Sequence, residues 1–219
     1  MFPRPDLRPH RLRRGTLVAG GACVIALLGA CTEDDGGAIS TDSTTAPDGE
    51  SGGSTSDADT TAGTLVDAAQ GGGAVSYDPA LAPIGAELTV GVEAGDEQTS
   101  VALEVSGLLA DRGYAAHLHT QPCGATGADA GPHFQQEVDP AATPEAPSAD
   151  PAFANPENEI WLDVETDADG AGTSSAEVPF AFGSEGPRSL VVHAEEATAT
   201  EPGEAGSAGD RVACMTLAS

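Results

Sequence analysis

The sequence contains no lysine, and only eight arginines stand against 35 aspartates and glutamates. Five of the arginines lie within the first 14 residues, so residues 31–219 carry a formal charge of −31. A chain this acidic lacks the basic surface that phosphate groups require, which argues against binding to nucleic acid. The same charge argues against adsorption of these residues to an anionic membrane surface.

Aromatic residues are also scarce, at 4% of the chain, whereas the sequence contains 28 glycines and 16 prolines. We therefore expect much of the chain to lie outside any packed core. No window of 12 or more residues shows apolar side chains at helical spacing, which argues against a helical fold.

The N-terminal arginines precede an apolar stretch, residues 16–28, that is too short to span a bilayer comfortably. Residues 28–31 read Leu-Gly-Ala-Cys, in which small residues precede a cysteine as in a bacterial lipobox. We predict a lipoprotein signal peptide over residues 1–30 and lipidation of Cys31, which would anchor the protein at the extracytoplasmic face of the cell membrane. The alternative is an ordinary signal peptide with a chance cysteine, and the paired arginines at 13 and 14 leave twin-arginine export open.

Residues 31–73 are dominated by Gly, Ser, Thr, Asp and Ala. Such a composition cannot bury enough apolar surface to offset its ordering entropy, so we predict a disordered tether. Its expected reach is roughly 35 Å. Leu65 and Val66 form the only apolar pair in its second half, which we interpret as chance rather than as an element.

From Ala74 onward, short segments alternate polar and apolar side chains, as half-buried strands do. The alternation is clear at 87–93 and 100–105, with a turn predicted between them. Five further strands are expected at 114–120, 159–165, 176–181, 189–194 and 212–217, with a turn at 167–170. Residues 74–219 are therefore predicted to form one all-β domain, an antiparallel sandwich or barrel.

Four histidines follow the signal peptide, namely His117, His119, His133 and His193. On a strand, His117 and His119 lie on one face about 6.6 Å apart, so both imidazoles can reach one metal ion. The alternative is a pair of ordinary half-buried histidines.

The surroundings of these histidines resemble the copper/zinc superoxide dismutase family. The resemblance rests on GYAAHLH at 113–119, GPHF at 131–134, RSLVVH at 188–193 and GSAGDRVAC at 206–214. It implies a Greek-key β-barrel of about eight antiparallel strands, in which all four histidines bind copper. It also implies that Arg211 holds the superoxide anion beside the copper. The alternative for Arg211 is a surface arginine in weak salt bridges, and we interpret Arg112 and Arg188 as structural.

Three cysteines follow the signal peptide. With Cys31 lipidated, the family resemblance pairs Cys123 with Cys214 in a disulfide, which an oxidising compartment outside the cytoplasm permits. The alternative is a metal site with cysteine ligands.

The family's zinc site uses the histidine at position 133, two more histidines and an aspartate. No histidine lies between 133 and 193, and the loop 135–158 offers five prolines and only carboxylates as zinc ligands. The aspartate that links the two metal sites in the family falls near Ala197. We therefore expect copper and no zinc, with the prolines stiffening the loop.

The sequence thus predicts a lipid-anchored, copper-dependent bacterial superoxide dismutase, which converts superoxide to oxygen and hydrogen peroxide. The alternative function is a copper-binding lipoprotein that buffers or delivers the metal without turnover. No pattern in the sequence indicates an oligomeric state.

Overall fold

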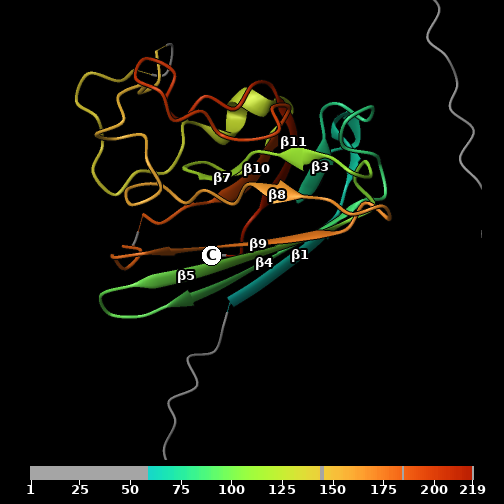
Figure 1. Ribbon diagram of the computed structural model, residues 1–219. Helices are drawn as coiled ribbons and strands as arrows, with labels where there is room; N and C mark the ends of the chain where they lie inside the picture. The colour runs from blue at the N-terminus through green and yellow to red at the C-terminus, as the bar shows by residue number, and fades with distance from the viewer. Residues whose placement is uncertain (1–58, 144–145, 184, 219) are drawn as a thin grey trace, which may run out of the picture. The chain divides into compact units, whose positions relative to one another are not determined.

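The computed structural model describes residues 59–143, 146–183 and 185–218, and two β-sheets form two layers in this part of the chain (Figure 1). The first sheet has the order β1-β4-β5-β9, and every neighbouring pair is antiparallel. Its strands are β1 Asp59–Thr64, β4 Glu87–Ala94, β5 Thr99–Ser106 and β9 Gly172–Val178.

The second sheet has the order β2-β3-β11-β10-β7, and only the β2–β3 pair is parallel. Its strands are β2 Val66–Asp67, β3 Ala74–Ser76, β7 Ala116–His119, β10 Ser189–His193 and β11 Arg211–Thr216. The remaining elements are β6 Gly113–Tyr114, which pairs with β8 Val164–Glu165, and the 3-10 helices η1 Ala68–Gln70 and η2 Gly127–Ala130. The predicted antiparallel all-β fold is confirmed.

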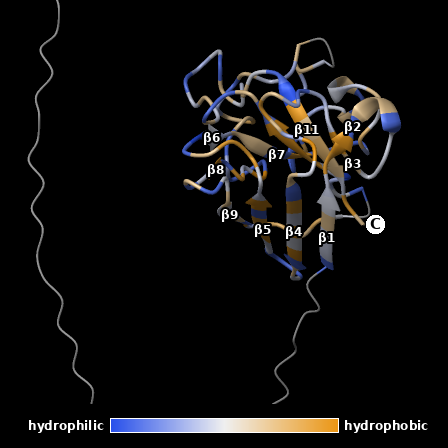
Figure 2. Ribbon diagram, turned by 90° about the vertical axis from the view of Figure 1, so that its right-hand side faces the viewer, coloured by the Kyte–Doolittle hydropathy of each residue, from blue (hydrophilic) through white to orange (hydrophobic). Residues whose placement is uncertain are grey.

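The core lies between the two sheets and follows the alternation of the sequence. In β5, Val101, Leu103 and Val105 are buried and the residues between them are exposed. β7 and β10 are buried on both faces. Figure 2 shows more apolar colour on β3 and β11 of the second sheet than on β1 and β4 of the first. In β7, Leu118 packs in this core, which leaves its neighbours His117 and His119 on the opposite face.

Two long loops, 120–163 and 194–210, cover that opposite face of the second sheet at the top left of Figure 1. They contact each other directly, since the backbone N–H of Gly203 donates to the carbonyl of Ala149 at 2.9 Å. The loops close over β7 and β10, which explains why both strands are buried on both sides.

Most predicted strands correspond to observed ones, with shifted ends. The segments 87–93 and 100–105 lie within β4 and β5, and Gly95 closes the hairpin between them by donating to the carbonyl of Gln98 at 2.8 Å. The segment 176–181 is displaced, because β9 begins at Gly172 and its polar residues pair with β5. Only the end of 159–165 forms a strand, as β8.

The predicted tether is wrong for residues 59–73, which belong to the β domain. The six residues of β1 pair with β4, and Leu65 is fully buried, with its backbone N–H donating to the carbonyl of Ala86 at 2.8 Å. An edge strand is held by backbone hydrogen bonds and tolerates polar side chains on its open face, so composition alone did not reveal it. The remainder of the tether and the signal peptide, residues 1–58, lie outside the described residues.

Candidate metal centre

The second sheet and the loop after it bring the four histidines together. His117 and His119 lie on β7, and His193 ends β10, the strand paired with it. His133 follows η2 and forms an antiparallel bridge with His119. A register shift after Val192 places His193 opposite Arg211 of β11, so the neighbouring strand also brings a cation to this place.

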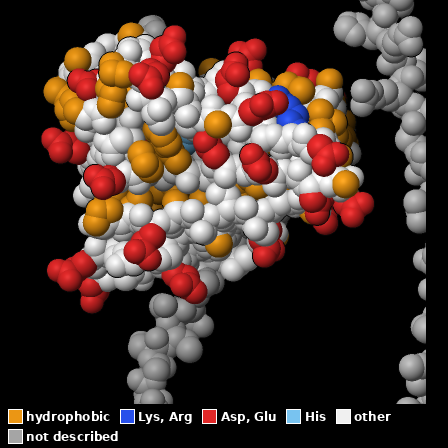
Figure 3. Space-filling model, in the orientation of Figure 1, with side chains coloured by type: hydrophobic (Ala, Val, Ile, Leu, Met, Phe, Trp, Pro, Cys, Tyr) orange, Lys and Arg blue, Asp and Glu red, His pale blue; other side chains and the backbone are white. Residues whose placement is uncertain are grey.

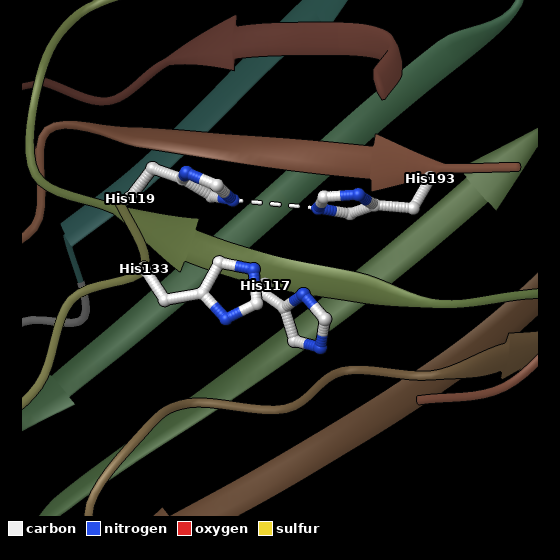
Figure 4. Close-up of side chains that lie close together, drawn as sticks. All are labelled: His117, His119, His133 and His193. Carbon is white, nitrogen blue, oxygen red and sulfur yellow. Dashed lines mark hydrogen bonds between the residues drawn. The ribbon is translucent and has the colours of Figure 1, made fainter. Parts of the chain in front are cut away.

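The four imidazoles converge, as Figure 4 shows. Each offers one nitrogen, and these four nitrogens lie within 4.8 Å of one another. His117 and His119 are fully buried and His193 is 3% exposed, while the side chain of His133 is 17% exposed. No other group of three or more potential metal ligands occurs in the part of the chain that the structure describes.

Hydrogen bonds determine which nitrogen of each ring carries its proton. The Nδ1 atoms of His119 and His193 lie 3.0 and 3.3 Å from the carbonyl oxygens of Gly131 and Gly209. Carbonyl oxygens only accept, so both Nδ1 atoms are donors and both Nε2 atoms keep a free lone pair. These two Nε2 atoms are only 3.4 Å apart. In neutral rings two acceptors face each other, a contact that a shared cation would stabilise.

In His117 the roles of the two ring nitrogens are reversed. Its Nε2 lies 2.7 Å from the hydroxyl of Thr198, and its Nδ1 is buried with no hydrogen-bond partner among the described residues. A buried nitrogen without a partner is costly unless something binds it, and a metal ion would do so. The donor set, four imidazoles, suits copper or zinc.

Burial keeps His117, His119 and His193 neutral, as metal ligands must be. It lowers the pKa of His117 and His119 well below the usual value of 6.5, and the neighbouring histidines lower it further. The pKa of His193 falls to about 3, mainly through burial and then through His133. Three of the four rings therefore hold a free lone pair at neutral pH without competition from protons.

A buried carboxylate, Glu159, occupies the outer side of His133. Glu159 is 2% exposed and accepts hydrogen bonds from His133 Nδ1 at 3.0 Å, Trp161 Nε1 at 2.7 Å and Gln135 Nε2 at 2.8 Å. In the neutral ring this contact places the proton of His133 on Nδ1 and leaves Nε2 free. A second metal ion would have to bind His133 through Nδ1, because Nε2 faces the other histidines. The carboxylate of Glu159 already occupies Nδ1.

The structure joins Cys123 to Cys214 in a disulfide. The bond attaches the loop before η2 to β11. The segment that follows Cys123, which includes η2, supplies the carbonyl of Gly131 that accepts from His119 and the carbonyl of Gly127 that accepts from Arg211 at 2.7 Å. The disulfide therefore stabilises the surroundings of the histidines as well as the fold.

Arg211 borders an open cleft of about 880 Å³, whose lining also includes His133 and His193. The other two described arginines differ from it. The guanidinium of Arg112 lies 4.4 Å from the centre of the Tyr114 ring and donates to the carbonyl of Ala194, and Arg188 is exposed. Arg211 is thus the arginine in the described residues that faces the histidine group.

Three residues of this site escaped the sequence analysis: Glu159, Asp163 and Thr198. Glu159, Trp161 and Asp163 alternate with the buried Ile160, Leu162 and Val164. This alternation places them on one face, which could have drawn attention to both acids. Thr198 lies next to Ala197, where this chain lacks the aspartate that links the two metal sites in the family. Thr198 hydrogen-bonds both His117 and Asp163.

Comparisons with known proteins point to the family that the sequence motifs resemble. The family model described as copper/zinc superoxide dismutase matches residues 86–217. The Cu/Zn superoxide dismutase from Brucella abortus is similar at 19% identity over 73% of this chain and 99% of that chain, with a TM-score of 0.45. A double mutant of a SOD-like protein from Bacillus subtilis is similar at 19% identity over 60% and 88% of the two chains, with a TM-score of 0.41. Both structural likenesses are weak. None of the curated proteins matches the chain.

Proposed function

Because the chain belongs to the copper/zinc superoxide dismutase family, we propose that it is a copper-dependent superoxide dismutase anchored by lipid outside the cytoplasm. The family and the four-histidine group support a dismutase-like or copper-binding role directly. The observation that carries the finer proposal is that the four histidines bring one ring nitrogen each within 4.8 Å of one another. Arg211 stands beside this group on an open cleft.

Copper, when bound there, would supply one-electron redox chemistry, in which one superoxide is oxidised to oxygen and a second is reduced to hydrogen peroxide. The protein's own residues prepare the reaction. His117, His119, His133 and His193 would hold the ion, and their hydrogen bonds to Thr198, Gly131, Glu159 and Gly209 orient the rings. Arg211 would bind the superoxide anion through charge-assisted hydrogen bonds at the end of the cleft.

We propose that copper acts without zinc. His133 Nδ1 is engaged by Glu159, and Glu159 is itself held by two further donors. The other carboxylates described in loop 135–158 do not gather with His133 into a group of three or more ligands. Glu159 therefore takes over the orienting contact that a second metal would otherwise make.

An assay separates the enzyme from a copper carrier. The copper-loaded protein is compared with a variant in which all four histidines are replaced by glutamine, using pulse radiolysis to follow superoxide decay. We expect catalysis in proportion to bound copper and none from the variant. Stoichiometric copper that accelerates superoxide decay no more than the variant does would favour the buffering or delivery function.

Lipid anchoring is part of the proposal and rests on the sequence at 28–31, outside the described residues. Among the described residues, no helix has the length and apolar character needed to cross a membrane. We expect the mature protein to begin at lipidated Cys31, and Cys31→Ser to abolish lipoprotein processing. Mass spectrometry of the mature N-terminus checks this, and an unmodified chain that begins at another residue would contradict it.

The charge around the cleft predicts an unusual dependence of rate on salt. Loop 194–210 carries five carboxylates and no basic residue, and all five are exposed: Glu195, Glu196, Glu201, Glu204 and Asp210. Acidic side chains are scattered over the face in Figure 3, where arginine side chains lie at one place. The Debye length is about 10 Å at 0.1 M salt, so salt screens the repulsion from the acidic side chains of the whole chain more than the attraction of Arg211 at close range.

We therefore expect the second-order rate constant to lie below the diffusional ceiling of roughly 10⁹ M⁻¹s⁻¹ and to stay flat or rise with ionic strength. Arg211→Ala should lower it about tenfold, which corresponds to about 1.4 kcal/mol. Pulse radiolysis at several salt concentrations measures both effects, with the exposed Arg188→Ala as a control expected to change little. A rate that falls steeply as salt rises would mean that positive potential does guide the substrate.

A further inference from the structure

The side chain of Thr198 links His117 to a carboxylate that is not a metal ligand. Thr198 is 8% exposed, and its hydroxyl lies 2.7 Å from His117 Nε2 and 2.7 Å from Asp163 Oδ1. The other oxygen, Asp163 Oδ2, accepts the backbone N–H of Thr198 at 2.7 Å. Asp163 thus holds both the backbone and the hydroxyl of Thr198 in place.

Counting protons along this chain gives its direction. A carboxylate only accepts, so the hydroxyl of Thr198 donates its single proton to Asp163. The hydroxyl oxygen must then accept from His117, which places the proton of His117 on Nε2. Nδ1 of His117 is left with a lone pair, and it is this atom that is buried without a partner in the described part of the chain.

The other three histidines have the opposite arrangement, since their Nδ1 atoms face carbonyl or carboxylate oxygens. A group built from one Nδ1 and three Nε2 atoms requires that one ring be held in a different tautomer from the rest. Thr198 is the hydrogen-bond partner that makes His117 different.

We propose that Thr198, oriented by Asp163, is a positioning residue that fixes the tautomer of His117 and presents its Nδ1 to the metal. The inference rests on the proposed copper site but is testable without copper. Partners of this kind typically contribute 10–100-fold to metal affinity. Thr198→Val removes the hydroxyl, and Thr198→Ser keeps it.

Asp163→Asn makes a sharper variant. The short bond from the Thr198 backbone requires an acceptor at the Oδ2 position, so the new amide NH₂ would occupy the Oδ1 position, where the other backbone donor, Ala116, is more distant at 3.3 Å. The NH₂ would then donate to the hydroxyl of Thr198, and the hydroxyl would donate to His117 Nε2. The tautomer of His117 should therefore invert.

The test is nitrogen-15 NMR of the histidine rings in the full-length, copper-free protein at neutral pH. We expect His117 to be protonated on Nε2 in the wild type and in Thr198→Ser, and on Nδ1 in Asp163→Asn. In Thr198→Val the preference should be lost. Copper affinity, measured by competition with a chelator, should fall about 10–100-fold in Thr198→Val and only a few-fold at most in Thr198→Ser.

A wild-type His117 protonated on Nδ1 would overturn the inference, as would a Thr198→Val protein with unchanged tautomer and copper affinity. Failure of the proposed function looks different. A wild-type protein that shows the expected tautomer but binds no copper would contradict the copper site and leave the role of Thr198 in setting the tautomer standing.

Discussion

Removing the disulfide between Cys123 and Cys214 is expected to lower the free energy of unfolding by about 4.5 kcal/mol. The two cysteines are 91 residues apart, so the bond closes a long loop and restricts the unfolded chain strongly. Cys214 is fully buried, so both cysteines are replaced by alanine rather than serine, which would bury a hydroxyl group. The variant is Cys123→Ala/Cys214→Ala. Urea unfolding followed by the fluorescence of Trp161, the single tryptophan, measures the change.

The wild type after reduction serves as the control, because it loses the same bond without any substitution. A decrease below about 1 kcal/mol in both proteins would contradict the expectation. The site should respond too, since the segment after Cys123, with η2, supplies the carbonyls that accept from His119 and Arg211. We expect copper affinity to fall together with stability.

Leu65→Ala is expected to lower the free energy of unfolding by about 3 kcal/mol, within the usual range for a buried leucine. Leu65 is fully buried in the main core cluster, although it lies in a stretch of small and polar residues. Leu65 lies between β1 and β2, and the substitution removes most of the large apolar side chain that it buries in the core. Urea unfolding provides the measurement.

Ile84→Ala is a matched control close by. The residue after Ile84, Gly85, donates its backbone N–H to the carbonyl of Leu65, and the side chain of Ile84 is 52% exposed. Its replacement should change the free energy of unfolding by no more than about 0.5 kcal/mol. Equal, small effects at both positions would mean that residues 59–73 are not an integral part of the domain.

The region around Leu65 also shows which part of the fold could not be predicted from the sequence. Edge strand β1 consists of Asp, Thr, Ala and Gly, and its bonds to β4 run through the backbone, which composition does not report. The clear alternation in β4 and β5, by contrast, arises because each has one face in the core, and it located both strands. Strands covered on one face only are readable from sequence, and polar edge strands are not.

The same distinction applies to the site. His117 and His119 were placed on one face by alternation within a single strand, and the structure has them there. Asp163 and Thr198 meet through the packing of segments 35 residues apart, so no local pattern could join them. Glu159 was missed for a similar reason, because its partner His133 comes from a loop rather than from a neighbouring strand position.

The central claim is that one copper ion at the four histidines, without zinc, supports dismutation. It is tested most directly by adding copper in small steps to the metal-free protein in zinc-free buffer and measuring superoxide decay and bound metal at each step. We predict that activity rises linearly to one copper per chain and then stays constant. We also predict that added zinc neither binds tightly nor changes this activity. Activity that requires zinc, or one bound copper without activity, would contradict it.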